Sequence, residues 1–521
     1  MSNFLLLSIN TTAMKDKETY VKDDLFELIQ SLTKTEKRYF KIYASRHIIG
    51  EEKKSILLFD YLAKQANYQH KATLEYCSNF IKMKQFSISK NRLHTFILSA
   101  LDSYYANSSG EAQIFKLLHS FEILFHKSLY SQCAKTLHKA EKLADKHSLF
   151  TLLPEIQKQQ KRLFETSKNT AASPAAIEHL LARDLQISKE NEHFSTLWSI
   201  KSKLFYQIAT KGNARTDDEK GLFSMFIQNM PKREDLIGFE TIYLYHHILS
   251  AYYFAIGQAQ TSYEHVCLLL DWMQQHSKID DKNTNRYIAL LSNAIHLAEK
   301  LNNKKAANNF LQTLKSLGTK DQVIHSEDLR LKHFATSASS ELNHYIQRGE
   351  LNKAELLIPA IKENLSYFDS KIALPKKAYI LFKIAVVHLM KGNNSIALKE
   401  INAVLNLPGI EQVEGIFSNA QLLAILIHLE LKHHDFIAYS LKNTQRYLKS
   451  RKRLFAFETV FLKNISYLLK ASDAIDAEER WEKLFQELAK LNYENDELEL
   501  FDFLKWAKAK KQKIAFISLI N

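Results

Sequence analysis

From about residue 112 onward, the sequence repeats one local pattern. A turn-forming residue is followed five positions later by a small residue, and apolar residues come four and seven positions after the small one. The turn residues of the five copies are Ser128, Gly257, Asn302, Gly349 and Gly392. Glycine and asparagine accept the left-handed conformation that ends a helix, and a small residue lets two antiparallel helices approach closely. The pattern therefore predicts five copies of one helical hairpin.

The copies follow one another at a nearly regular spacing. The small residues Ser262, Ala307, Ala354 and Ala397 are 43–47 positions apart, and Cys133 lies three such steps before Ser262. This spacing predicts two further repeats inside the gap, near residues 176 and 219. The repeat near 219 is a poor match, because acidic residues stand where small apolar ones are expected.

Two other positions disturb the pattern. His433 occupies the turn position one step after Gly392, with Ala438 as the small residue, but Lys442 then stands where an apolar residue is expected. Pro359 lies inside the second helix of its copy, and we expect it to kink or shorten that helix. The repeat is therefore expected to be less regular at these points.

Scarcity of glycine and proline supports a helical fold. The chain has 11 glycines and 6 prolines in 521 residues, against typical usage of about 7% and 5%. Sandwiches, barrels, collagen-like chains and glycine-cradled nucleotide sites need more residues at positive φ or rigid corners. No apolar run reaches the roughly 18 residues of a membrane-spanning helix. The composition therefore predicts an all-α protein that does not cross a membrane.

Cysteine usage and charge bear on compartment and partners. Cys77, Cys133 and Cys267 are far apart and form no CxxC pair, which argues against a disulfide framework or a zinc knuckle. We expect them to be small buried residues of a cytoplasmic protein. The net charge of +14 favours acidic partners or nucleic acid, and it also fits a generally basic solvated surface.

Two turns carry a resemblance to a known family. The stretches from Gly349 to Ala354 and from Gly392 to Ala397 resemble the turn between the two helices of a tetratricopeptide repeat (TPR). The resemblance covers residues 112–450, with a longer step than the family's period of about 34 residues. It implies an α-solenoid of TPR-like hairpins, a right-handed superhelix whose concave face binds peptides or helices.

The sequence divides into four parts. They are a disordered tail at 1–19, an N-terminal helical module at 20–106, TPR-like helical repeats at 112–450, and a C-terminal helical cap at 451–521. Translation starts at Met1 or at Met14. The N-terminal module is predicted to contain five helices. Thr33 and Glu36 have the capping-box form that starts one of them, and Ser89 is expected to cap the last.

Signatures of enzymes and metal sites are missing from the sequence. It contains no HExxH, GxSxG, GxxxxGK[ST] or GxGxxG motif. The adjacent pairs His246–His247 and His433–His434 point to different faces of a helix, so neither pair is able to chelate one metal ion. We therefore predict no catalytic residue, metal or cofactor.

Basic residues in the N-terminal module are candidates for nucleic-acid binding. The candidates are Lys34, Lys37, Arg38, Lys41, Lys90 and Arg92. The first four lie at helical spacing, and the last two open the helix expected after Ser89. A helix with a basic amino end is typical of a recognition helix, although a solvated basic face has the same pattern.

Tyrosines crowd one predicted helix. Tyr243, Tyr245, Tyr252 and Tyr253 are too many for one buried stripe. We expect some of them to form a partner-binding face, because aromatic residues are enriched in interface hot spots. Packing between long helices is the alternative, since buried aromatic residues also dominate core energetics.

Together these features favour a non-catalytic scaffold or adaptor that holds another protein or peptide on a TPR-like solenoid. The alternative is a regulator whose N-terminal module binds nucleic acid while the solenoid senses a partner. An all-helical enzyme is a third reading, which a deep polar cleft with converging titratable groups would reveal.

Overall fold

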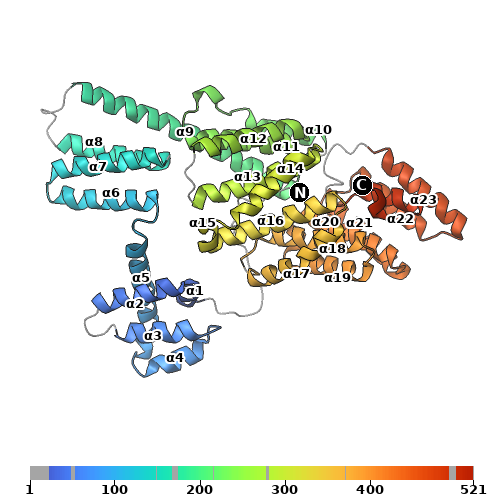
Figure 1. The fold of residues 1–521 in the computed structure, drawn as a ribbon, viewed down its shortest axis with the longest axis horizontal. Coiled ribbons are helices and arrows are strands. Elements are labelled where there is room, and N and C mark those ends of the chain that lie inside the picture. The colour runs from blue at the N-terminus through green and yellow to red at the C-terminus, as the bar shows by residue number, and fades with distance from the viewer. Residues whose placement is uncertain are drawn as a thin grey trace. The chain divides into compact units, whose positions relative to one another are not determined.

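The computed structural model describes residues 23–47, 53–147, 149–166, 174–214, 216–276, 281–369, 371–491 and 500–519. Every regular element in these ranges is a helix, which confirms the all-α prediction (Figure 1). Among the described helices, none combines the length and the apolar character needed to cross a membrane. The tail expected at 1–19, with its two candidate start methionines, lies outside the described residues.

The described helices belong to two compact units, residues 23–187 and 188–519. The first unit holds α1 (Asp24–Ser31), α2 (Lys34–His47), α3 (Lys53–Lys64), α4 (His70–Ser78), η2 (Met83–Gln85), α5 (Phe86–Tyr105), α6 (Gly110–His126), α7 (Tyr130–Lys146), η3 (Phe150–Leu152), α8 (Leu153–Thr166) and the start of α9 (Pro174–Lys211). Helices α1 to α5 are the five helices predicted for the module. They share one core, in which Ile29, Phe40, Leu58 and Leu93 are fully buried.

One of the two predicted helix starts in this region is confirmed and the other is wrong. The Thr33 hydroxyl accepts a hydrogen bond from the Glu36 N–H at 3.2 Å, and the Glu36 carboxylate accepts one from the Thr33 N–H at 2.6 Å. This reciprocal pair is the predicted capping box. Ser89, in contrast, does not cap α5, because the helix already begins at Phe86, whose side chain is buried in the same core.

The second unit continues α9 and adds a long series of helices. They are α10 (Asp217–Ile227), η5 (Arg233–Asp235), α11 (Phe239–Ala255), α12 (Ala259–His276), α13 (Asp281–Lys300), α14 (Lys304–Leu317), α15 (Asp321–His325), α16 (Glu327–Gln347), α17 (Leu351–Tyr367), α18 (Leu374–Met390), α19 (Asn394–Leu405), η6 (Ile410–Gln412), α20 (Glu414–Glu430), α21 (His434–Ser450), α22 (Ala456–Leu468), α23 (Ala474–Ala489), α24 (Phe503–Gln512) and η7 (Phe516–Leu519).

Five turns of this unit share one three-residue connection, and the turn between α6 and α7 has the same form. The middle residue has a positive φ in each: Gly257, Asn302, Gly349, Gly392 and Lys432, with Ser128 in the first unit. The residue after it donates its N–H to the carbonyl oxygen five positions back, at 2.7–3.0 Å. This hydrogen bond is the signature of the Schellman motif, which satisfies carbonyl groups at a helix end.

The spacing predicted after each turn is confirmed by burial. After Gly392, for example, Ala397, Ile401 and Val404 are all 0% exposed. The equivalent residues after Ser128, Gly257, Asn302 and Gly349 are also buried. These five copies therefore place the same three positions of their second helix in the core.

The register expected at the sixth turn is wrong by one residue. Lys432 rather than His433 has the left-handed conformation, with φ +60°. The buried positions are then Ile437, Leu441 and Thr444, while Lys442 is exposed. With Lys432 as the turn residue, this copy has the same spacing as the others. Lys442 then falls on the exposed face and does not disturb the pattern.

Two other irregular points also differ from expectation. Of the two extra repeats predicted between Cys133 and Ser262, the one near residue 219 falls on α10 and stays a prediction. The one near residue 176 is not a separate hairpin, because the single 38-residue helix α9 spans residues 174–211. No glycine, and no proline after Pro174, interrupts this stretch. Helix α17 continues through Pro359 for eight more residues, so the proline does not shorten it.

Successive hairpins pack on one another in chain order. The first helices form a series in which α13 packs on α16, α16 on α18, and α18 on α20. The second helix of each hairpin packs on the first helix of the next, as α14 does on α16, α17 on α18, and α19 on α20. From α16 onward the buried residues form one core that extends to the final helices and includes Leu484 of α23 and Trp506 of α24.

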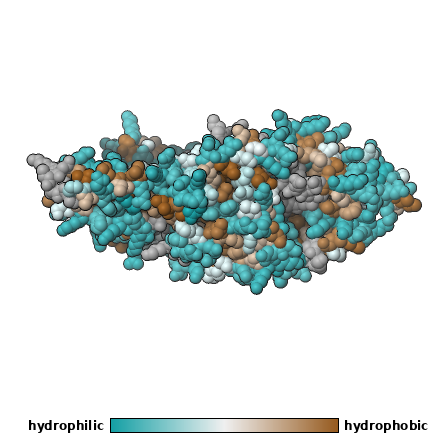
Figure 2. Space-filling model, turned by 90° about the horizontal axis from the view of Figure 1, so that it is seen from above, coloured by the Kyte–Doolittle hydropathy of each residue, from teal (hydrophilic) through white to brown (hydrophobic). Residues whose placement is uncertain are grey.

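The surface that remains is largely hydrophilic. Figure 2 shows hydrophilic side chains over much of the visible face, with hydrophobic side chains between them. Leu356 and Ile475 are among the most exposed large hydrophobic residues, at 80% and 74%. Most described helices thus bury one face and expose a polar one, as expected for amphipathic helices.

The turn geometry gives the first prediction. Gly392 has φ +79° and no atom near the position that a Cβ would take, so Gly392→Ala should cost only backbone strain, about 1 kcal/mol. Lys432 adopts the same conformation with a side chain, so Lys432→Gly should stabilise by up to about 1 kcal/mol. Urea denaturation of both variants checks this. Equal effects of the two substitutions would contradict it.

Candidate functional site

Two of the four tyrosines predicted to contact a partner lie in the core. Tyr243 is 2% exposed, and the Arg286 guanidinium lies over its ring at 4.4 Å from the ring centre. Tyr252 is 8% exposed, and its hydroxyl is 2.9 Å from that of Ser224. Their helix, α11, has 13 of its 17 residues buried. These two tyrosines therefore pack between helices, as the alternative to partner binding predicted.

The other two tyrosines, Tyr245 and Tyr253, are half-buried. Tyr253 stacks on His265 of α12 with 5.6 Å between ring centres, and the Nδ1 atoms of His265 and His246 are 3.0 Å apart. Burial raises the pKa of Tyr245 and lowers that of His246 to about 4. Tyr245 and Tyr253 are the two candidates that reach the surface, and their role in partner binding stays a prediction.

The basic residues of α2 are only partly available to a ligand. Lys34 and Arg38 are exposed one turn apart, Lys37 is half-buried, and neither Lys34 nor Arg38 has an ion-pair partner among the described residues. Lys41 pairs with Asp60 of α3 at 2.7 Å. The face that α2 offers is therefore formed mainly by Lys34 and Arg38.

The sequence predicted that Lys90 and Arg92 open a helix, and this prediction is wrong. Helix α5 begins at Phe86, so both residues lie beyond its first turn. The Lys90 ammonium is half-buried, pairs with Asp23 and lies 3.4 Å from the Tyr68 hydroxyl. Asp23 also caps α1. Lys90 therefore joins two helices of the core, while Arg92 is exposed.

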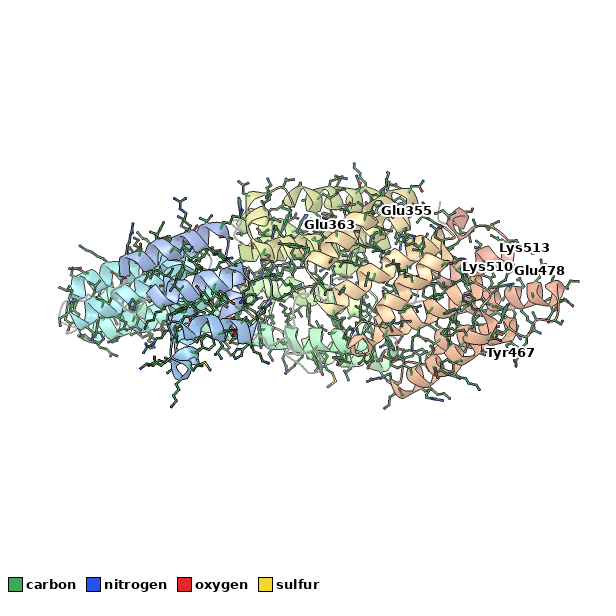
Figure 3. All side chains as sticks on the ribbon, turned by 90° about the horizontal axis from the view of Figure 1, so that it is seen from below. Glu355, Glu363, Tyr467, Glu478, Lys510 and Lys513 are labelled. Atoms are coloured by element: carbon green, nitrogen blue, oxygen red, sulfur yellow. The ribbon has the colours of Figure 1, made fainter. Side chains whose placement is uncertain are left out.

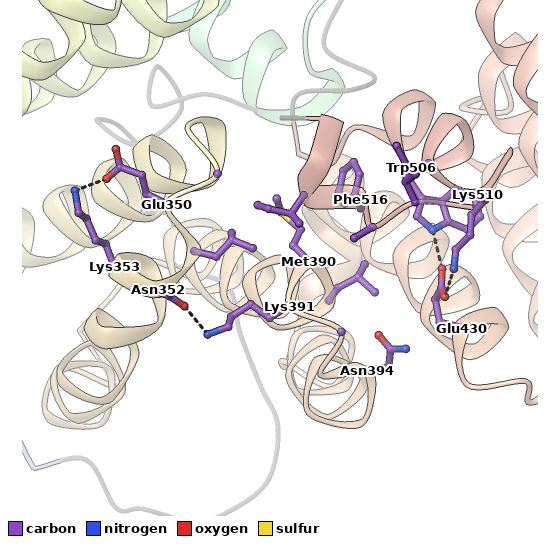
Figure 4. Close-up of a pocket in the computed structure, with 18 residues that line it drawn as sticks. Glu350, Asn352, Lys353, Met390, Lys391, Asn394, Glu430, Trp506, Lys510 and Phe516 are labelled. Atoms are coloured by element: carbon purple, nitrogen blue, oxygen red, sulfur yellow. Dashed lines mark hydrogen bonds and ion pairs between the residues drawn. The ribbon is translucent and has the colours of Figure 1, made fainter. Parts of the chain in front are cut away.

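One hollow of the second unit lies where turns of consecutive hairpins meet the C-terminal residues. We call it the turn pocket. It has a volume of about 660 Å³ and is lined by residues 349–353, 389–392, 394, 430, 506, 509, 510 and 514–517. Figure 4 shows the two turns on one side and Trp506, Lys510 and Phe516 on the other. Its volume is in the range typical of ligand sites.

The lining combines apolar side chains with paired charges. Leu351, Leu389 and Met390 supply apolar surface from the turns. Lys353 pairs with Glu350 at 2.6 Å, while Lys391 donates to the Asn352 side chain at 3.0 Å and also pairs with Glu355.

These lysines affect the neighbouring carboxyl groups. The hydrogen bond from Lys353 holds the pKa of Glu350 below its usual range, and the one from Lys391 does the same for Glu355. Both carboxylates are therefore ionised at neutral pH. Each is neutralised by its lysine.

One carboxylate fixes the C-terminal wall of the turn pocket. Glu430, the last residue of α20, accepts a hydrogen bond from the Trp506 indole N–H at 2.8 Å and pairs with Lys510. At the end of α24, Lys513 pairs with Glu478 at 2.9 Å, and Figure 3 shows both side chains beside Lys510. The C-terminal helix is thus tied to α20 and to α23.

The acidic groups that line the turn pocket are paired with lysines. Both of its lining carboxylates, Glu350 and Glu430, pair with lysines, so neither is arranged as a general base. In the described part of the chain, no group of three histidine, cysteine or acidic side chains is placed to hold a metal ion. The lining therefore places apolar side chains beside paired charges.

Sequence reasoning missed the turn pocket. The turns at Gly349 and Gly392 were predicted, but the packing of residues 506–517 against them brings together segments more than 100 positions apart. The signal that the sequence offered was the short C-terminal run of apolar residues after Lys513. Comparisons with protein-family models, with curated proteins and with solved structures find no match to this chain.

Proposed function

We propose that the second unit is an α-solenoid of TPR-like hairpins that binds a segment of another protein without catalysis. Five hairpins with the same Schellman turn support the proposal. So does the stacking of α13, α16, α18 and α20, because hairpins that contact only their neighbours in chain order form solenoids.

The turn pocket is the observation that carries the binding role. It lies between the turns of two consecutive hairpins and combines apolar lining with polar groups at its rim. Peptide-binding sites commonly combine an apolar pocket for side chains with polar groups that hold the backbone. The resemblance of these same two turns to those of TPR proteins agrees with such a role.

Affinity purification of the full-length protein from its native cells, with and without nuclease, tests the proposal. We expect a defined protein partner that survives nuclease treatment. Ala515 is exposed and lines the turn pocket, so Ala515→Trp should fill the hollow and reduce partner recovery about tenfold. Ala474→Trp, at an exposed position outside the pocket, is the matched control and should leave recovery unchanged. Recovery unaffected by Ala515→Trp would contradict the proposal.

A second candidate function rests on α2. Lys34 and Arg38 lie one helical turn apart, are exposed and have no ion-pair partner among the described residues. We infer that this face is able to contact phosphates if the first unit binds nucleic acid. Partners lost on nuclease treatment, together with loss of salt-dependent DNA binding in a Lys34→Glu/Arg38→Glu variant, would favour this function over the first.

A further inference from the structure

A second hollow of the second unit is strongly basic. We call it the basic pocket. It has a volume of about 460 Å³ and lies between the α13–α14 turn and the α16–α17 turn. Lys304, Lys305, Arg348 and Lys353 contribute four cationic groups to its lining, and Glu350 contributes one anionic group. Glu350 and Lys353, drawn in Figure 4, border both this hollow and the turn pocket.

Two of these cationic side chains are accessible to a ligand. Lys304 and Lys305 are exposed and form no ion pair with any described residue. They are the first two residues of α14, where the helix dipole adds positive potential. Arg348 donates to the Lys304 carbonyl oxygen at 2.7 Å, which ties the two turns together and keeps the guanidinium at the pocket.

The polar groups of the lining fit an anion that also offers hydrogen bonds. Asn308 and Gln312 of α14 carry amide groups on the same side of the hollow. His344 is 3% exposed, and its Nδ1 lies 2.6 Å from a carboxylate oxygen of Glu299. A carboxylate is an acceptor only, so Nδ1 donates, and Nε2 forms no hydrogen bond with another described residue. In the tautomer with its proton on Nδ1, Nε2 is an acceptor, so this buried histidine is able to receive a backbone N–H of a bound segment.

We propose that the basic pocket binds an acidic segment of a partner protein, through two or three neighbouring carboxylate side chains. The inference rests on the proposed function, since it names the partner chemistry of the same unit. Ammonium groups on flexible stems and amide donors suit carboxylates that vary in position. Nucleic acid requires a continuous basic surface. The basic surface does not continue into the turn pocket, because the lysines there are paired with Glu350, Glu355 and Glu430.

Fluorescence anisotropy of a labelled hexaglutamate peptide, titrated with the full-length protein at low salt, tests the proposal. We expect saturable binding that Lys304→Glu/Lys305→Glu weakens at least about tenfold, because the charge reversal opposes the peptide. Glutamate is favourable in a first helical turn, so this variant should fold. Lys399→Glu/Lys442→Glu changes the net charge equally at exposed positions of α19 and α21 and should keep binding within about twofold.

Absence of peptide binding would overturn the inference, and so would equal weakening by both double variants. Tighter binding of a labelled oligothymidylate that Lys304→Glu/Lys305→Glu also abolishes would overturn it as well, because it would assign the pocket to phosphodiesters. If native partners stay bound to Lys304→Glu/Lys305→Glu but are lost from Ala515→Trp, the basic pocket inference fails while the proposed function stands.

Discussion

Replacing Arg286 by methionine is expected to lower the free energy of unfolding of the second unit by about 3 kcal/mol or more. Arg286 forms two hydrogen bonds with Glu240, at 3.0 and 2.7 Å, and the two side chains are only 18% and 10% exposed. Without the guanidinium, the Glu240 carboxylate loses both hydrogen bonds to its cation at a position that is largely shielded from solvent. The ring of Tyr243 loses a stacked cation as well.

A double variant separates the loss of the pair from the cost of the remaining charge. Glu240→Leu/Arg286→Met removes both charges, and buried ion pairs replaced by apolar residues are often neutral, so we expect stability within about 1 kcal/mol of wild type. Lys332→Met is the surface control. Its pair with Asp328 is 39% and 64% exposed, so its loss should cost less than about 1 kcal/mol.

Tryptophan fluorescence during urea denaturation measures these effects in the intended unit. The chain has four tryptophans, and all of them, Trp198, Trp272, Trp481 and Trp506, belong to the second unit. Equal destabilisation by Arg286→Met and Lys332→Met would show that the Glu240–Arg286 pair behaves as a surface pair. A double variant as unstable as Arg286→Met would assign the loss to packing around Tyr243.

The hairpins were predictable because their determinants are local. A left-handed residue closes one helix, and the positions five, nine and twelve residues later fall on one face of the next. Glycine at positions 349 and 392 indicates such turns directly, because glycine accepts a positive φ. Lys432 does not, because lysine has no preference for positive φ, and only the Schellman hydrogen bond from His433 to the His428 carbonyl reveals the register.

The sites were less predictable because they depend on contacts between distant segments. Lys90 looked like a free cation at a helix start, but Asp23, 67 positions earlier, pairs with it. The same limitation applies to Tyr243, whose ring contacts the guanidinium of Arg286 from another helix. Basic residues next to the turns at Asn302 and Gly349 were visible in the sequence, but their convergence on one hollow follows only from the packing of α14 against α16.

Acid is expected to destabilise the second unit through its buried histidines. Burial lowers the pKa of His246, His247, His265, His333, His388 and His428. All six belong to the second unit. His247 is the most enclosed of the six: it is 1% exposed, and neither ring nitrogen has a hydrogen-bond partner among the described residues. Lys201 and Arg286 add to the depression of its pKa.

The sign of the effect follows from where the proton binds. The folded pKa of each histidine lies below its ordinary value of 6.5, so the unfolded chain takes up protons first as the pH falls. The stability is therefore complete above pH 6.5 and is lost as the pH falls from 6.5 toward the folded pKa, which is about 4 for His246. At pH 5, His247 should cost about 2 kcal/mol, and partly exposed His246 about half as much.

Urea denaturation at pH 7 and pH 5, followed by tryptophan fluorescence, should therefore show a loss of about 3 kcal/mol or more for the wild type. His247→Leu removes a titrating group and two unsatisfied nitrogens, so it should be at least as stable as wild type at pH 7 and should lose about 2 kcal/mol less between the two pH values. His276 is exposed, so His276→Gln is the matched control and should keep the wild-type pH dependence. An unchanged pH dependence in His247→Leu would mean that His247 already takes up its proton in the folded unit.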